Sequence, residues 1–135
     1  MATDKTVYLI YTDAVATHIE LMLELGETRF GVAEPDLIKS ALARPRHAAV
    51  YEKADIVRQA ATLCYGLIKN HPWVGGNKRT ASALTDAFLW YNGLVLTTTL
   101  PETIEMVLAV ESSQWKVDEI ETWLRQRVSR RELPG

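Results

Sequence analysis

The sequence predicts an all-α protein, a compact bundle of about six helices in a single domain that spans residues 1–135. Three observations favour this class. Apolar residues recur at helical spacing in successive segments, the connections between these segments are short, and proline or glycine stands at most of the expected helix ends. A chain of 135 residues fits one domain and is long enough to bury a hydrophobic core.

The first helix is expected to begin near Thr12 or Asp13, because both residue types suit an N-cap position, and to end at Gly26. The apolar run at 7–11 is either a brief strand or an apolar lead into this helix, since its length does not decide between the two. His18 lies on or beside the apolar face of the helix, which favours a packing role.

The second helix is expected to begin with Pro35 in its first turn and to end at Pro45. Proline suits the first turn, but elsewhere it removes a backbone N–H and disfavours the helical conformation of the residue before it. Residues 46–53 are ambiguous. Within them, 47–51 could form a short extended β flap, so that His47 lies either beside an active site or in a solvated loop.

The third helix has the clearest pattern. Its apolar face begins after Asp55, is broad enough for a central place in a bundle, and stops at Asn70 and Pro72. A short glycine-containing loop follows. The fourth helix is then expected to begin near Asn77 and to close at Gly93.

The C-terminal part predicts a short extended link at 94–96 and two more helices. Pro101 suits the first turn of the fifth helix. The last helix is expected to start near Asp118 and to include Val128. Several arginines near its end suit the negative end of the helix dipole.

Composition excludes several classes of protein. The formal net charge is −2, which gives no general attraction to nucleic acid or to an anionic membrane, and residues 80–91 hold no lysine or arginine for a basic recognition helix. The one cysteine, Cys64, cannot form an intrachain disulfide or a cysteine–zinc cluster. No secretory signal and no membrane-spanning apolar run are visible, so a soluble, cytoplasmic protein is expected.

The segment with the strongest chemical signal joins the third and fourth helices. Lys78 and Arg79 stand in the first turn of the fourth helix, where the helix dipole normally favours acids. Free backbone N–H groups are also present there, so two cations at this end indicate a bound anion such as a phosphate. Gly75 and Gly76 allow the backbone to approach a ligand closely.

Two further side chains complete this candidate phosphate site. Asn77 can either cap the fourth helix or donate a hydrogen bond to a phosphate oxygen. His71 stands at the mouth of the loop, and a histidine can accept a proton from an attacking hydroxyl at neutral pH. Taken alone, His71 could equally be a helix C-terminal residue favoured by the dipole.

The string His71-Pro-Trp-Val-Gly-Gly-Asn-Lys-Arg79 resembles the motif of the Fic/Doc family, His-x-Phe-x-Asp/Glu-Gly-Asn-Gly/Lys-Arg. Trp73 replaces the family phenylalanine. Lys78 stands where many Fic enzymes have glycine, and Ser82 stands where many have a second arginine. In both respects the chain is similar to the Doc branch. The resemblance extends over about residues 8–128, including His18 and the segments 36–45 and 87–93.

The resemblance implies a fold of about six helices and group transfer from ATP or another nucleoside triphosphate to a protein hydroxyl. Doc-type proteins transfer the terminal phosphoryl group to a translation elongation factor, are toxins, and are silenced by an antitoxin. Fic enzymes usually transfer AMP. In this chain His71 would be the catalytic base, with Asn77, Lys78 and Arg79 on the phosphates. The backbone of 76–78 would form the anion hole.

The antitoxin would act in trans, because the chain has no evident inhibitory segment of its own. In the wider family an inhibitory helix presents a glutamate to the anion-site arginine, which here is Arg79. No nucleic acid or membrane partner is expected.

Position 75 departs from the family motif. Gly75 replaces the acid that holds Mg²⁺ against the phosphates, so no metal ligand is assigned there. Three readings follow. Mg²⁺ is held by phosphates and water alone, or Asp86 or Glu52 substitutes, or the protein is a catalytically impaired binding module. An intact pocket would gain Mg²⁺-dependent activity from Gly75→Asp. A helix–turn–helix nucleic-acid binder is the remaining alternative, disfavoured by the charge.

Overall fold

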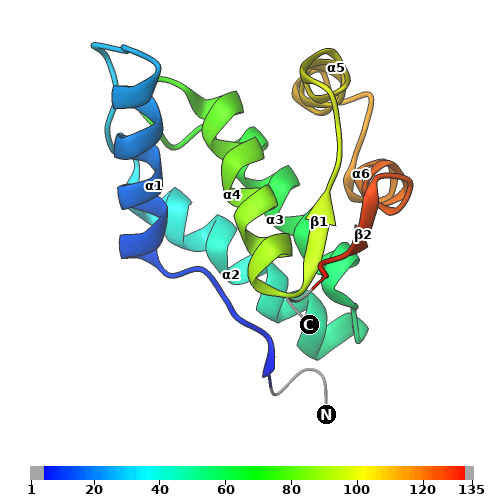
Figure 1. The fold of residues 1–135 in the computed structure, drawn as a ribbon. Helices are drawn as coiled ribbons and strands as arrows, with labels where there is room; N and C mark the ends of the chain where they lie inside the picture. The colour runs from blue at the N-terminus through cyan, green and yellow to red at the C-terminus, as the bar shows by residue number, and fades with distance from the viewer. Residues whose placement is uncertain (1–4, 133–135) are drawn as a thin grey trace.

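Helix α3 (Ile56–Asn70) forms the centre of the fold, and the other helices pack around it (Figure 1). The computed structural model describes residues 5–132. The surrounding helices are α1 (Tyr11–Glu24), α2 (Pro35–Glu52), α4 (Asn77–Tyr91), α5 (Leu100–Glu111) and α6 (Val117–Arg125). Helices α2, α4, α5 and α6 contact α3, whereas α1 packs on α4 and α2. The prediction of an all-α helical fold is confirmed.

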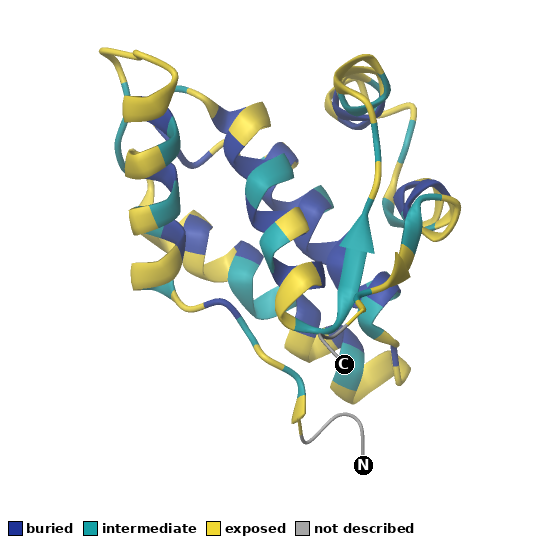
Figure 2. Cartoon of the chain, viewed as in Figure 1, coloured by how far each residue is buried: buried dark blue, intermediate teal, exposed yellow. Residues whose placement is uncertain are grey.

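The broad apolar face of α3 accounts for its central place. Ten of its fifteen residues are buried, and Figure 2 shows α3 largely in the buried colour while α1 and α5 expose their outer faces. Asp55 caps the helix, since its Oδ1 accepts a hydrogen bond from the Arg58 N–H at 3.0 Å. The cysteine in this helix, Cys64, is buried, and burial raises its pKa to about 11. It is therefore a core residue and not a thiolate nucleophile.

The prediction that Pro45 ends the second helix is wrong, and so is the extended flap at 47–51. Helix α2 runs through both, to Glu52. An interior proline costs an isolated helix about 3 kcal/mol. Here Pro45 lies on the buried face, in line with Ile38, Ala41 and Ala48. Burial of this continuous stripe, on the helix that packs most extensively along α3, outweighs the local cost.

The start of α1 resolves the ambiguous apolar run. Residues 7–10 are not a strand, and they lead directly into a helix that begins at Tyr11. Asp13 still serves as a cap, but from the third helical position, where its Oδ2 accepts from the Ile10 N–H at 3.3 Å. Gly26 follows the helix end with a φ of +71°, as a glycine C-terminal signal predicts.

The C-terminal end differs from the prediction of one helix that reaches Val128. Helix α6 ends at Arg125, and β2 (Val128–Arg130) pairs antiparallel with β1 (Leu94–Leu96). Val128 is partly buried against the core, and the edge of the extended link at 94–96 supplies backbone partners. A strand therefore buries the Val128 side chain and pairs its backbone with residues 94–96, which another turn of helix would not do.

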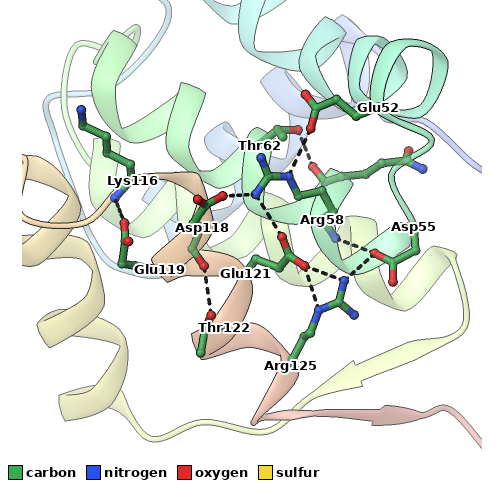
Figure 3. A network of polar contacts seen from close by, with 11 residues as sticks. Glu52, Asp55, Arg58, Thr62, Lys116, Asp118, Glu119, Glu121, Thr122 and Arg125 are labelled. Carbon is green, nitrogen blue, oxygen red and sulfur yellow. Dashed lines mark hydrogen bonds and ion pairs between the residues drawn. The ribbon is translucent and has the colours of Figure 1, made fainter.

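A polar network fastens the start of α3 to α6 (Figure 3). The Arg58 guanidinium pairs with Glu52, Asp118 and Glu121, and Arg125 pairs with Asp55 and Glu121. These pairs are mostly exposed, so they help to orient α6 on α3 but add little to the stability of the fold. None of the helices within residues 5–132 has both the length and the hydropathy of a membrane span.

Candidate active site

A cavity of about 490 Å³ lies where the end of α1 and the loop after it face the start of α4. Its lining includes all six residues that the sequence predicts for the site: His71, Gly75, Gly76, Asn77, Lys78 and Arg79. The remaining lining residues come from α1, from the loop that follows it, and from Val74. The folded chain therefore gathers the whole predicted set around one space.

His71 is placed by an unusual backbone conformation. It follows the last residue of α3 with φ +50° and ψ +52°, a left-handed conformation that few residues other than glycine adopt. This turn ends α3 and directs the chain into the loop at 72–76. The His71 side chain is exposed and lines the cavity. It is thus accessible from solvent.

Asn77 holds the loop in shape. Its Oδ1 accepts from the Trp73 N–H and its Nδ2 donates to the Trp73 carbonyl, both at 3.0 Å. The side chain is buried. Both polar groups of the Asn77 side chain are therefore used within the loop, and this side chain does not cap α4, because Gly76 holds the N-cap position. The backbone N–H of Asn77, in the first turn of α4, is the group that fits the predicted contact with a phosphate.

The start of α4 is built without a cap. Gly76 occupies the N-cap position with φ +69°, so the N-cap residue has no side chain to accept a hydrogen bond from the first turn, and the first turn contains no acid. The Lys78 ammonium lies 3.4 Å from the Glu111 carboxylate of α5, while none of the ion pairs between residues 5 and 132 includes Arg79. An uncapped helix start with two cations suits an anionic group.

Position 75 leaves no room for a side chain. A Cβ atom built on Gly75 would lie 2.7 Å from the Arg29 carbonyl oxygen, well inside van der Waals contact. The loop after α1 therefore stands where the family acid would project. The two acids that sequence reasoning offered as substitutes lie elsewhere. Glu52 pairs with Arg58, and Asp86 lines a separate cavity in which burial raises its pKa.

Both Gly75→Ala and Gly75→Asp are expected to lower the free energy of unfolding by about 1–3 kcal/mol, because each adds the Cβ that meets the Arg29 carbonyl. Chemical denaturation of the two variants measures this loss. Gly75→Asp is then not expected to gain Mg²⁺-dependent activity, in contrast to the expectation from an intact pocket. Unchanged stability in both variants would contradict the close approach of the loop.

His18 ties the loop after α1 to α4. The Gly31 N–H donates to His18 Nε2 at 3.0 Å, so the ring proton is on Nδ1, which bonds Thr80 Oγ1 at 2.8 Å. The ring also stacks on Trp73, with centroids 4.2 Å apart. His18 is fully buried, which confirms its predicted packing role. Burial lowers its pKa and keeps it neutral.

His18→Ala is expected to destabilise the fold by about 2–4 kcal/mol, since it leaves a cavity and two unpaired polar groups. The native protein should also lose stability in acid. Because the folded pKa of His18 is below its unfolded value of about 6.5, its contribution is complete above that pH and decreases as the pH falls below it. Unfolding titrations at about pH 7 and pH 5 measure both effects, and His18→Ala should show the smaller pH dependence.

Comparison with known proteins identifies the family of the chain. The sequence model of the Fic/DOC family matches residues 8–89. The chain is 40% identical over 84 residues to a protein from Mycolicibacterium smegmatis that is named Toxin Doc, an alignment that covers 57% of this chain and 64% of that relative. The chain thus matches slightly less than two thirds of the relative's length. The family match spans more than half of the chain and includes the entire segment 71–79, so the protein belongs to the Fic/DOC family.

Proposed function

We propose that the protein is a Doc-type toxin of a toxin–antitoxin pair, which transfers the terminal phosphoryl group of ATP to a hydroxyl of a translation elongation factor. The observation that carries this proposal is the cavity that His71, Lys78, Arg79 and the uncapped start of α4 line together. The name of the relative, Toxin Doc, supports the toxin assignment. Lys78, where many Fic enzymes have glycine, favours phosphoryl transfer.

The proposed reaction uses each part of the cavity. His71 accepts the proton of the attacking hydroxyl, whose oxygen forms a bond to the γ-phosphorus while the bond from that phosphorus to the bridging oxygen breaks and ADP leaves. Lys78 and Arg79 offset the charge on the phosphates, together with the backbone N–H groups at the start of α4. A bound Mg²⁺ would add further charge neutralisation.

AMP transfer is the second candidate reaction. In that case the hydroxyl attacks the α-phosphorus and pyrophosphate leaves, and the same cations serve a nucleotide bound in the reverse sense. A binding module without chemistry is the third candidate, favoured by the absence of an acid at position 75.

We also propose regulation by an antitoxin in trans, which the exposure of Arg79 supports. A glutamate from the antitoxin would occupy the place of a phosphate and form a charge-assisted hydrogen bond, worth about 1.5–3 kcal/mol. Self-inhibition of the purified protein, relieved by deletion of one of its own terminal segments, would count against this arrangement.

The position of a radioactive label distinguishes the three candidates. The protein is incubated with a bacterial lysate and Mg²⁺-ATP labelled on either the γ- or the α-phosphate. Protein labelling from γ alone that is absent with His71→Ala supports the proposed kinase, and labelling from α that is absent with His71→Ala establishes AMP transfer. No His71-dependent labelling with either form would leave the binding module as the better account.

A further inference from the structure

Glu27 lines the cavity but has no role in the proposed reaction. It lies in the loop after α1 and lines the same space as His71, Lys78 and Arg79. It is also the one acidic residue in that lining. The motif segment gives no signal for it, because Glu27 is distant in the sequence and reaches the site only through the packing of α1 on α4.

The loop that carries Glu27 is held at both ends. The Glu27 N–H donates to the Met22 carbonyl of α1 at 2.9 Å. At the far end, Gly31 donates to the buried His18 and accepts from the Val74 N–H at 2.8 Å. Between these anchors, the Arg29 carbonyl fills the place of a side chain on Gly75. The loop that carries Glu27 therefore occupies the space that the side chain of an acid at position 75 would need.

The charges in the cavity indicate what Glu27 binds. Two cations line the same space, yet none of the ion pairs within the described chain joins Glu27 to either of them. A free carboxylate beside a polyphosphate repels it. A hard divalent cation between the two removes this repulsion, and Mg²⁺ is typically bound by one or two carboxylates together with substrate phosphates.

We propose that Glu27 supplies the protein carboxylate for a divalent cation shared with the nucleotide phosphates, in place of the acid missing at position 75. The assignment rests on the proposed function, because the cation is expected to bind only together with nucleotide. Within residues 5–132 no three His, Cys, Asp or Glu side chains are grouped to hold a metal by themselves.

The test measures binding instead of activity. Mn²⁺ is titrated into the protein saturated with a non-hydrolysable ATP analogue, and bound Mn²⁺ is followed by electron paramagnetic resonance. Glu27→Gln is expected to weaken Mn²⁺ binding by about 10- to 100-fold. The matched control is Glu24→Gln, because Glu24 is an exposed acid at the end of α1 that does not line the cavity, and its Mn²⁺ affinity should stay unchanged.

Affinity for the analogue without metal is measured in parallel. Glu27→Gln should raise this affinity, since it removes a negative charge beside the phosphates, whereas a purely structural role would lower it or leave it unchanged. Analogue binding combined with unaltered Mn²⁺ affinity in Glu27→Gln would overturn the Glu27 assignment alone. Failure of the native protein to bind the analogue at all would overturn the proposed function and the cation site together.

Discussion

Replacement of His71 by alanine is expected to reduce the rate of transfer by about 100- to 10,000-fold, the usual contribution of a positioned general base. Nucleotide affinity should remain close to that of the native protein, because Lys78, Arg79 and the start of α4 are left in place. Single-turnover transfer from labelled ATP measures the rate, and titration with a non-hydrolysable analogue measures the affinity.

The backbone at His71 calls for a second variant. Its φ of +50° is disfavoured for alanine, so His71→Ala combines loss of the base with local strain. Asparagine adopts this conformation more readily and cannot serve as a base, so His71→Asn isolates the chemical effect. Equal loss of activity in both variants supports the role of base. Near-native activity in His71→Asn would show that His71 acts only through the backbone.

Replacement of Arg79 by alanine is expected to weaken nucleotide binding by about 10- to 150-fold. This range corresponds to the loss of one charge-assisted hydrogen bond of about 1.5–3 kcal/mol. Arg79 lines the cavity and, within the described residues, takes part in no ion pair that would have to be broken first. Calorimetric titration with the analogue provides the measurement, and Arg79→Lys should lie between the native protein and Arg79→Ala because it keeps the charge but not the forked geometry.

Lys69→Ala is the matched control for Arg79. It also removes one positive charge, but Lys69 lies at the end of α3, bonds Ser113 at 2.7 Å and does not line the cavity. Its effect on affinity should be small. If Lys69→Ala and Arg79→Ala weakened binding equally, the overall charge and not a phosphate contact would account for both.

Much of the fold and of the site geometry could be predicted from local patterns. The apolar face of α3 was broad enough to indicate a central helix, and the order of residues in 71–79 indicated a phosphate-binding turn between two helices. These features depend on residues close together in the sequence, so local patterns are sufficient to predict them. The cavity does gather the six predicted residues.

The wrong predictions depend on contacts between distant segments. Pro45 is a helix breaker by local propensity, and only the burial of its face against a neighbouring helix explains why α2 continues. The strand at Val128 requires the edge of residues 94–96. Likewise, the loop carbonyl against Gly75 and the acid at position 27 enter the site only when α1 packs on α4.

The most direct test of the central claim is the mass of a purified bacterial elongation factor after incubation with the protein and Mg²⁺-ATP. We expect an increase by one phosphate group, localised to a hydroxyl side chain and absent with His71→Ala. An unmodified elongation factor, under conditions in which the protein binds the ATP analogue, would contradict the claim that this cavity performs phosphoryl transfer to that target.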